Sequence, residues 1–392
     1  MATINTCGGA APLGGAPRPA GAVSRRSFLS LAGGAAALAC GAGLAGCSSS
    51  EETAEAVDYN EMTLDEIIAQ AQEEGEVCSV GMPDTWANWV ETWEDLEELY
   101  GITHTDDDMS SAEEIAMFKE EGTDATKDIG DVGQQWGPTA EEQEVTLKYK
   151  TSYWDEIPDW AKDDDGDWIV GYYGTIAIIS SDSQVATAPT SIADLLEGDY
   201  KVTLGDIATA SQSQHAMLAI AYALGGGIDD MQPAYDFVAT LIDEGRLDSS
   251  DGSLARLESG EVACALLWDY NALNYRAQIV EGNPDASFSV CIPSDGSVQS
   301  GYATIINVNA PHPAAACLAR EYILSDEGQI NLARGYATPI RDSVELPEDV
   351  QELRLDSSQY GDQLQSIDYE VWTEVCEDVI EYYQENLLPL LG

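Results

Sequence analysis

The sequence predicts an α/β protein whose body has two lobes joined by two chain crossings. Helical and strand-like segments alternate from Thr63 onward, as in the βα units of layered α/β proteins. Two runs rich in β-branched and aromatic residues, 168–180 and 301–308, share the pattern Tyr-x-Thr-Ile. The first run is too long for one small lobe, so both suit strands that cross between lobes. With 392 residues, 44% of the sequence being hydrophobic, the chain can form two such lobes.

A capping box formed by Thr63 and Glu66 predicts the start of the first helix, which ends near Gly75. Short buried runs and apolar residues at helical spacing then alternate through residues 63–172, the expected first part of lobe one. The predicted elements are strands at 77–81, 102–105 and 129–133, and helices at 86–100 and from Ser110 or Ser111 through Phe118.

The second lobe is predicted to cover residues 175–300, between the two crossings. Its predicted elements are helices at 190–196, 214–224 and 234–244, and strands at 201–205, 262–268 and 287–292. After the second crossing, residues 302–392 are expected to return to lobe one, with helices at 313–324, 327–333 and 367–388.

The N-terminal 46 residues have the composition of an export signal. They contain three arginines and no acidic residue, and the pair Arg25-Arg26 precedes an apolar stretch, as in twin-arginine signals. That stretch is shorter than the ~20 apolar residues of a membrane span. It ends in Leu44-Ala45-Gly46-Cys47, which resembles the lipobox at which bacterial lipoproteins are cleaved and acylated. We therefore expect a lipid on Cys47.

Residues 47–62 are polar and acidic and lack periodicity, which predicts a flexible tether. The mature protein is expected at the outer face of the cell membrane, on the periplasmic side if an outer membrane exists. Its lipid alone would hold it there.

Removal of the signal leaves 13 basic against 71 acidic residues, a formal charge of −58. Such a charge excludes nucleic acid as a partner, and solubility in a salty or acidic habitat is enough to explain it. The five cysteines after Cys47 have no CxxC spacing and the chain has only three histidines, so we expect neither a metal site nor a cofactor. The sequence leaves open whether one disulfide forms.

Residues 309–341 resemble the closing segment of bacterial extracellular solute-binding proteins of ABC importers. The likeness rests on Asn-Ala-Pro-His-Pro-Ala-Ala-Ala at 309–316, Tyr-Ile-Leu-Ser-Asp-Glu-Gly-Gln at 322–329 and Tyr-Ala-Thr-Pro-Ile-Arg at 336–341. Residues 81–89 and 268–273 look like the ligand-side loops of that family, in the branch that handles polyamines, thiamine, ferric iron and phosphonates. The resemblance extends over nearly all of residues 63–345.

This resemblance implies a type II periplasmic-binding-protein clamshell. Such a protein binds one small solute in the cleft between its lobes, closes over it, and presents it to a membrane permease with a cytoplasmic ATPase. The chain is accordingly expected to be a binding protein and not an enzyme.

Ligands of α/β lobes lie beyond the carboxyl ends of the strands, so the residues after each predicted strand are candidate contacts. With positions from the two crossings, the candidates are Asp84, Thr85, Trp86, Ser111, Gln135, Trp136, Tyr173, Thr175, Ser211, Ser213, Trp268, Asp269, Tyr270 and Tyr302. Several are aromatic, two are carboxylates and none is basic, which favours an organic cation such as a polyamine or thiamine. We expect Asp84 and Asp269 to face each other across the cleft.

Two other ligand chemistries stay open. Serines at predicted helix N-termini suit phosphate or phosphonate, although they are also ordinary N-caps and the net charge opposes an anion. The pair Tyr172-Tyr173 resembles adjacent tyrosines of ferric-iron-binding members. Neighbouring side chains of a strand point to opposite faces, however, which disfavours one shared metal ion.

Two other classes of protein compete with an importer subunit. An exported hydrolase is disfavoured because G-x-S-x-G, H-E-x-x-H and S-x-x-K do not occur in a convincing context, and three histidines offer little for a general base. A structural surface lipoprotein would more often show internal repeats, and we find none.

Overall fold

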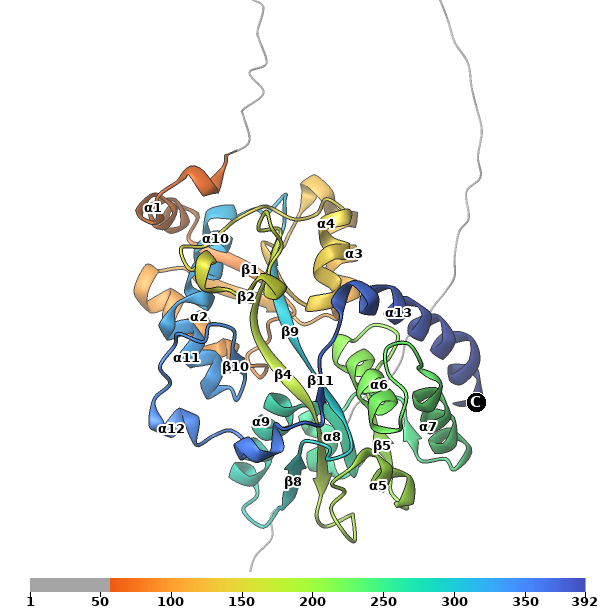
Figure 1. Ribbon diagram of the computed structural model, residues 1–392. Coiled ribbons are helices and arrows are strands. Elements are labelled where there is room, and N and C mark those ends of the chain that lie inside the picture. Colours follow the sequence, from red (N-terminus) through yellow and green to blue (C-terminus); the bar gives the residue numbers. More distant parts are fainter. Residues whose placement is uncertain (1–56, 392) are drawn as a thin grey trace, which may run out of the picture. The chain divides into compact units, whose positions relative to one another are not determined.

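The computed structural model describes residues 57–391, which belong to one compact unit (Figure 1). The predicted export signal, Cys47 and most of the predicted tether lie outside the described residues. Within the described residues, every helix is too short or too polar to cross a membrane.

A continuous sheet runs through the body in the strand order β2-β1-β3-β9-β4-β7-β5-β6. The first three strands are β1 (Glu76–Val80), β2 (Thr103–Asp107) and β3 (Ile129–Gly133). The second half contains β5 (Val202–Thr203), β6 (Leu247–Asp248), β7 (Cys264–Trp268) and β8 (Phe288–Cys291). β1 pairs in parallel with β2 and β3, and β5 pairs in parallel with β6 and β7, as expected for two βα lobes.

Two long antiparallel strands, β4 (Trp168–Ser181) and β9 (Ser297–Ile306), connect these halves. The first part of β4 pairs with β9, whereas Ile176 to Ser180 pair with β7. β9 also pairs with β3 in the first half. Tyr172 lies opposite Tyr302 and Tyr173 opposite Gly301, which confirms that the two Tyr-x-Thr-Ile runs are neighbouring crossing strands.

Helices cover this sheet on both sides (Figure 1). Those of the first half are α1 (Leu64–Glu74), α2 (Trp89–Tyr100), α3 (Ser111–Glu121), α4 (Gly137–Glu142), α10 (Pro313–Leu324), α11 (Asp326–Arg334) and α12 (Glu348–Gln351). The others are α5 (Ile192–Glu197), α6 (Ser211–Ala223), α7 (Gln232–Asp243), α8 (Leu254–Ser259), α9 (Asp269–Gly282) and α13 (Tyr369–Tyr382). The capping box at Thr63 and Glu66 is present and starts α1 as predicted.

Two helices depart from the prediction. α2 begins at Trp89 instead of residue 86, because Ala87 and Asn88 adopt left-handed backbone angles that a helix cannot contain. α9 was not predicted, and residues 268–273, expected as a loop, include its first turn. The backbone after β7 therefore turns directly into a helix.

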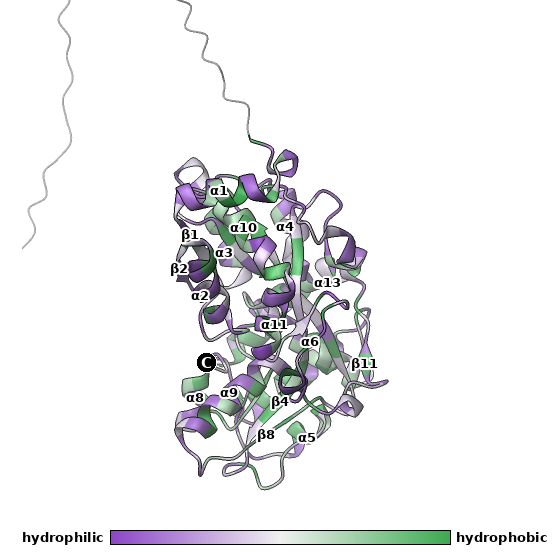
Figure 2. Cartoon of the chain, turned by 90° about the vertical axis from the view of Figure 1, so that its left-hand side faces the viewer, coloured by the Kyte–Doolittle hydropathy of each residue, from purple (hydrophilic) through white to green (hydrophobic). Residues whose placement is uncertain are grey.

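Helix α10 forms much of the first half's core. Residues 314–324 are all buried, and α1 packs against the helix. Figure 2 shows α10 in the hydrophobic colour, whereas the edge strand β2 is hydrophilic. Apolar packing around α10 thus holds the crossing strand β9 against the first half.

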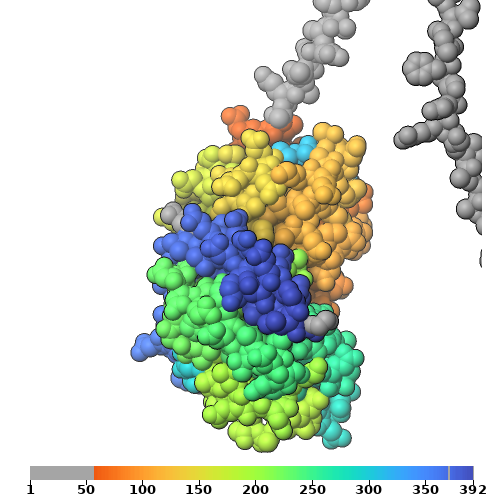
Figure 3. Space-filling view, turned by 90° about the vertical axis from the view of Figure 1, so that its right-hand side faces the viewer, coloured from red at the N-terminus to blue at the C-terminus, as the bar shows by residue number. Residues whose placement is uncertain are grey.

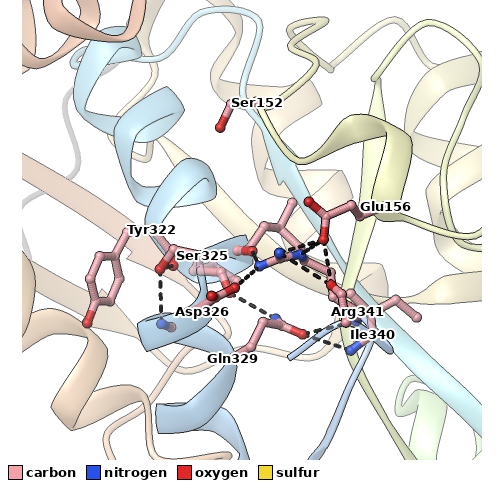
Figure 4. A network of polar contacts seen from close by, with 12 residues as sticks. Ser152, Glu156, Tyr322, Ser325, Asp326, Gln329, Ile340 and Arg341 are labelled. Carbon is pink, nitrogen blue, oxygen red and sulfur yellow. Dashed lines mark hydrogen bonds and ion pairs between the residues drawn. The ribbon is translucent and has the colours of Figure 1, made fainter. Parts of the chain in front are cut away.

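The Ser-Asp-Glu-Gly-Gln segment at 325–329 has a clear structural role (Figure 4). The Ser325 hydroxyl caps α11 by accepting a bond from the Gly328 amide. The Gln329 side chain donates to the Gly171 carbonyl at 2.8 Å and accepts from the Ile340 amide at 2.8 Å. Gly171 lies at a register shift of β4, between Val170 and Tyr172, so this motif fixes the start of the crossing strand.

The C-terminal segment makes an additional connection. Strand β10 (Thr338–Pro339) pairs with β4, and β11 (Leu364–Gln365) pairs with the start of β9. The sequence groups residues 302–392 with lobe one, whereas α13 packs against α6 and the residues after it pack against α7. Figure 3 shows this blue segment lying across the green residues of the second half.

Candidate functional site

Two adjacent cavities open where the two halves face each other beyond the strand ends. The outer cavity has a volume of about 620 Å³ and the inner one about 140 Å³. Both are lined by the same central residues, which are Pro83, Trp86, Asp108, Met109, Ser110, Ala210 and Gln212. They follow β1 and β2 in the first half and lie at the N-terminal end of α6 in the second. We call the two cavities together the cleft.

Six of the fourteen sequence-predicted contact residues line this cleft. Thr85, Trp86 and Ser213 line the outer cavity, and Trp86, Ser111, Ser211 and Tyr302 line the inner one. Each of them, except Tyr302 of the crossing strand β9, follows a strand or begins a helix. The rule that ligands lie beyond strand ends, with the crossing strands added, therefore predicts six residues that line the cleft.

The chemistry of the cleft is dominated by carboxylates. Its acidic lining residues are Asp108, Glu113, Glu114, Asp131, Asp206 and Asp251. Among the described residues that line the two cavities, none is lysine, arginine or histidine. The cleft is thus lined by acidic residues without a basic counter-charge among these described residues.

Glu114 and Asp131 form the buried floor of the inner cavity. Glu114 is 1% exposed and Asp131 2% exposed. Oε2 of Glu114 accepts a 3.0 Å hydrogen bond from the backbone N–H of Asp131. Burial, followed for Glu114 by the charge of Asp131, raises the pKa of both carboxyl groups well above their usual range.

Two glycines make room for the Glu114 carboxylate. A Cβ atom at Gly81 would lie 2.4 Å from Glu114 Oε1, and one at Gly130 would lie 2.7 Å from Oε2. Gly81 also has a φ of +72°, which favours glycine. The carboxylate is therefore held in a slot that a side chain at either position would fill.

Asp131 is oriented by a chain of hydrogen bonds that starts at the cleft wall. The Trp86 indole N–H donates to the Tyr172 hydroxyl at 2.7 Å, and this hydroxyl donates to Asp131 Oδ2 at 2.6 Å. The other oxygen, Oδ1, is buried and accepts no hydrogen bond from the described residues. A buried acceptor without a partner is uncommon, and its presence on a residue that lines a cavity marks Asp131 as a candidate ligand contact.

Aromatic rings surround this floor. Trp86 makes edge-to-face contacts with Tyr270 and Tyr302, at centroid distances of 5.6 and 5.4 Å. Trp268 donates from its indole N–H to the Tyr302 hydroxyl at 3.3 Å and is fully buried behind it. Trp86 and Tyr302 line the cavity, whereas Trp268 and Tyr270 support them from within.

Two helix N-termini also face the cleft. Ser110 and Ser111 begin α3, and Ser211 begins α6. The Ser111 hydroxyl accepts from the Gly133 amide at 3.0 Å, and the Ser211 hydroxyl donates to Gln135 Oε1 at 3.1 Å. Both hydroxyls are therefore hydrogen-bonded within the protein. The first backbone N–H groups of each helix lie at the end that faces the cleft.

Asp84 and Asp269, the carboxylate pair expected from the sequence, do not line either cavity. Asp84 is exposed. Asp269 is buried at the start of α9, where Oδ1 accepts from the Thr175 and Tyr270 amides and Oδ2 accepts from the Tyr360 hydroxyl. Its carboxylate is therefore satisfied internally, and the acidic residues at the floor of the inner cavity are Asp131 and Glu114.

The remaining predicted contacts have other positions. Gln135 is buried and donates to Gln214 Oε1 at 2.9 Å, which links the two halves. Trp136 packs in the first half's core, and the Thr175 hydroxyl accepts from Gln299. Tyr173 lines a separate cavity of about 440 Å³ beside β9 and β11. Tyr172 and Tyr173 thus face different sides, as expected for strand neighbours.

Glu114 and Asp131 are not among the contacts predicted from the sequence, although each occupies a position where a carboxylate is unexpected. Glu114 lies on the same face of α3 as Ile115 and Phe118, where an apolar residue is expected. Asp131 interrupts the buried run Ile129–Gly133. A carboxylate at a core position is costly without a partner, which marks such residues as functional candidates.

Comparison with known proteins agrees with this architecture. A sequence profile described as bacterial extracellular solute-binding protein matches residues 124–367. No curated protein is significantly similar to the chain in sequence.

Solved structures share the fold at low sequence identity. The periplasmic binding protein AfuA from Actinobacillus pleuropneumoniae, with exogenous fructose-6-phosphate bound, has a TM-score of 0.62 and 16% identity over 80% of this chain and 98% of its own. The ferric binding protein from Campylobacter jejuni has a TM-score of 0.59 and 20% identity, covering 79% and 98%. The spermidine/putrescine substrate-binding protein PotD from Streptococcus pneumoniae has 0.54 and 17%, covering 79% and 98%.

The mixed α/β fold of this chain matches the two-lobed fold of these periplasmic binding proteins. The family profile covers more than half of the chain. This chain belongs to the bacterial extracellular solute-binding protein family.

Proposed function

We propose that this protein is the substrate-binding component of an ABC importer and captures a small organic cation, such as a polyamine or thiamine. Solute-binding proteins of this family deliver small solutes to ABC permease subunits. The observation that carries the ligand class is the Asp131 carboxylate, which lines the inner cavity with its buried Oδ1 unpartnered.

An ammonium group suits this floor for three reasons. It supplies a positive counter-charge for Asp131 and Glu114, which have no basic partner among the described residues lining the cavity. Its N–H groups can donate to Asp131 Oδ1, which has no donor within the described part of the protein. The rings of Trp86 and Tyr302 at the same cavity offer cation–π contact. The inner cavity of about 140 Å³ has room for a head group, and the larger outer cavity takes the remainder of the solute.

An anionic solute is the second candidate, because the N-termini of α3 and α6 both face the cleft. AfuA was solved with a sugar phosphate bound. The six acidic lining residues oppose a phosphate, however, and no arginine or lysine among the described lining residues offsets them. A ferric site on Tyr172 and Tyr173 is disfavoured because Tyr172 is fully buried and hydrogen-bonded to Asp131, whereas Tyr173 lines the separate cavity beside β9 and β11.

A thermal-shift screen tests the ligand class. The purified protein is heated with putrescine, spermidine, thiamine, neutral amino acids, phosphate, a phosphonate and ferric citrate in separate wells. A cation at 100 times its Kd should stabilise the protein by about 2.7 kcal/mol and raise its melting temperature. Stabilisation by phosphate or phosphonate and not by any cation would contradict the proposal.

The proposal includes a location at the outer face of the membrane through a lipid on Cys47 and a non-enzymatic role. The Leu44 to Cys47 lipobox supports the anchor. Membrane fractionation of the Cys47→Ala variant tests it, since the variant should leave the membrane fraction. Persistent membrane association would refute the anchor and leave the cleft assignment intact.

A further inference from the structure

A second cluster of ligating side chains lies on β1, away from the cleft. Cys78 of β1, Asp128 before β3 and His312 before α10 each offer one ligand atom, and these atoms lie within 4.8 Å of one another. The three residues are 50 and 184 positions apart, so no local motif predicts their meeting. The folded sheet brings them together.

The cluster is held rigidly by backbone hydrogen bonds. Asp128 is fully buried, and its Oδ2 accepts from the Cys78 amide at 2.7 Å. Its Oδ1 accepts from the His312 amide at 2.6 Å, and its own N–H donates to the Cys78 carbonyl at 2.7 Å. Strand β1, strand β3 and helix α10 are thereby fixed around one point.

A second carboxylate, that of Glu76, lies on the outer side of His312. Glu76 precedes Cys78 by two residues on β1, so both side chains project from the same face. Glu76 Oε1 is 3.4 Å from His312 Nε2, and His312 Nδ1 is 3.0 Å from Asp128 Oδ2. The imidazole is thus placed between two carboxylates, with the thiol next to them.

The cluster is accessible from solvent. The side chain of His312 is 20% exposed and that of Glu76 is 52% exposed, whereas Asp128 closes the inner side. Burial, with the charges of Asp128 and Glu76 adding to it, raises the pKa of the Cys78 thiol. A bound cation would reverse that shift, because it stabilises the thiolate.

We propose that Cys78, Asp128 and His312 bind one divalent transition-metal ion of the zinc class, with Glu76 as the hydrogen-bond partner of the imidazole nitrogen that faces away from the ion. Sulfur, imidazole nitrogen and carboxylate oxygen are the donors that Zn²⁺ prefers, and a water molecule would complete the four-coordinate set. Binding releases the Cys78 thiol proton, and one imidazole nitrogen must be free of its proton to ligate. The ion would cross-link β1, β3 and α10 and so stabilise the first half.

Co²⁺ is the appropriate probe, because a thiolate ligand gives a near-ultraviolet charge-transfer band that carboxylates cannot produce. The carboxylates of the cleft therefore do not interfere, and the described residues lining it include no cysteine. The full-length reduced protein is titrated with Co²⁺ and then with Zn²⁺. We expect a band that saturates at one Co²⁺ per chain and disappears as Zn²⁺ displaces it.

Variants assign the band to this cluster. Cys78→Ser should abolish it, and His312→Gln should weaken Co²⁺ binding by at least about tenfold. Cys291→Ser is the matched control, because Cys291 is the other half-buried free cysteine among the described residues, and it should leave the band unchanged. Should Cys78→Ser fail to fold, Zn²⁺ protection of Cys78 from alkylation in the wild-type protein gives the same answer.

Absence of a thiolate band in the folded wild-type protein would overturn this assignment. So would a band that survives in Cys78→Ser, or equal alkylation of Cys78 with and without Zn²⁺. The site does not depend on the cleft, so either proposal can fail without the other.

Discussion

The Tyr172 hydroxyl, on crossing strand β4, donates a 2.6 Å hydrogen bond to Asp131 Oδ2, on β3 of the first half. This bond joins the connection between the halves to the floor of the cleft. It satisfies one carboxylate oxygen and leaves Oδ1 for a ligand. A cation at Asp131 would therefore be bound at the base of the crossing strands, where opening and closing of a two-lobed protein are controlled.

Glu114 should make the ligand-free protein less stable at higher pH. Its folded-state pKa is raised above the ordinary value of about 4.3, so the folded state holds a proton that the unfolded state releases. Stability is then lost as pH rises through the folded pKa. Glu114→Gln should flatten the fall in melting temperature between about pH 5 and pH 8.

Glu113 provides the control for that measurement. Its hydrogen bonds with Ser110 lower its pKa, so it contributes stability above its unfolded pKa that is lost as pH falls. Glu113→Gln should therefore not flatten the loss at higher pH. Identical pH profiles for Glu114→Gln and the wild-type protein would show that Glu114 is not held as described.

The slot around Glu114 should be sensitive to one added methyl group. Gly81→Ala should lower the free energy of unfolding by about 1–2 kcal/mol because of the left-handed backbone at this position. The clash with Glu114 should lower it by roughly a further 1–3 kcal/mol. Gly75 has a similar φ of +77°, but a Cβ there meets no atom within 4 Å. Gly75→Ala should thus show only the backbone cost in urea denaturation, and equal losses for the two variants would contradict the slot.

Gln329 should be important for stability without contacting the cleft. Its loss leaves the Gly171 carbonyl and the Ile340 amide without their partner, at about 1–3 kcal/mol for each buried group. We expect Gln329→Ala to lower the free energy of unfolding by at least about 2 kcal/mol. Gln351→Ala, at an exposed position, should change it by less than about 0.5 kcal/mol, and a similar small effect for both would refute the role.

Cation binding should release protons. The raised pKa values of Asp131 and Glu114 mean that a cation gains most from the deprotonated forms. Affinity for spermidine should therefore rise from about pH 5 to about pH 8. Calorimetry in two buffers of different ionisation enthalpy measures the release directly, and affinity that falls with rising pH would be inconsistent with this floor.

The sequence was sufficient for the fold because its signals are local. The capping box at Thr63, the β-branched run from Trp168 and the repeated Tyr-x-Thr-Ile pattern each predicted an element that the structure contains. Helix α9 escaped prediction because its apolar residues do not form one stripe, and its start is defined by Asp269, Thr175 and Tyr360 from three distant segments.

The site was predictable only in part. Strand ends identify Trp86, Ser111 and Ser211, since the position after a strand is a local property. Which carboxylates face the cleft depends on tertiary contacts. The sequence therefore predicts Asp269 as a contact, although the Tyr360 hydroxyl donates a hydrogen bond to its carboxylate in the folded protein. Among 71 acidic residues, the decisive feature of Asp131 is its unpartnered buried oxygen, which no sequence pattern contains.

The most direct test of the cation-binding cleft is calorimetric titration of spermidine, or of the best cation from the thermal-shift screen, into wild-type, Asp131→Asn and Asp84→Asn proteins. Loss of one partner of a buried charge pair costs about 2–5 kcal/mol of binding free energy. Asp131→Asn should therefore weaken cation binding by at least about 30-fold. Asp84→Asn, at an exposed position outside both cavities, should bind within about twofold of wild type. Unchanged affinity in Asp131→Asn, or a large loss in Asp84→Asn alone, would contradict the account.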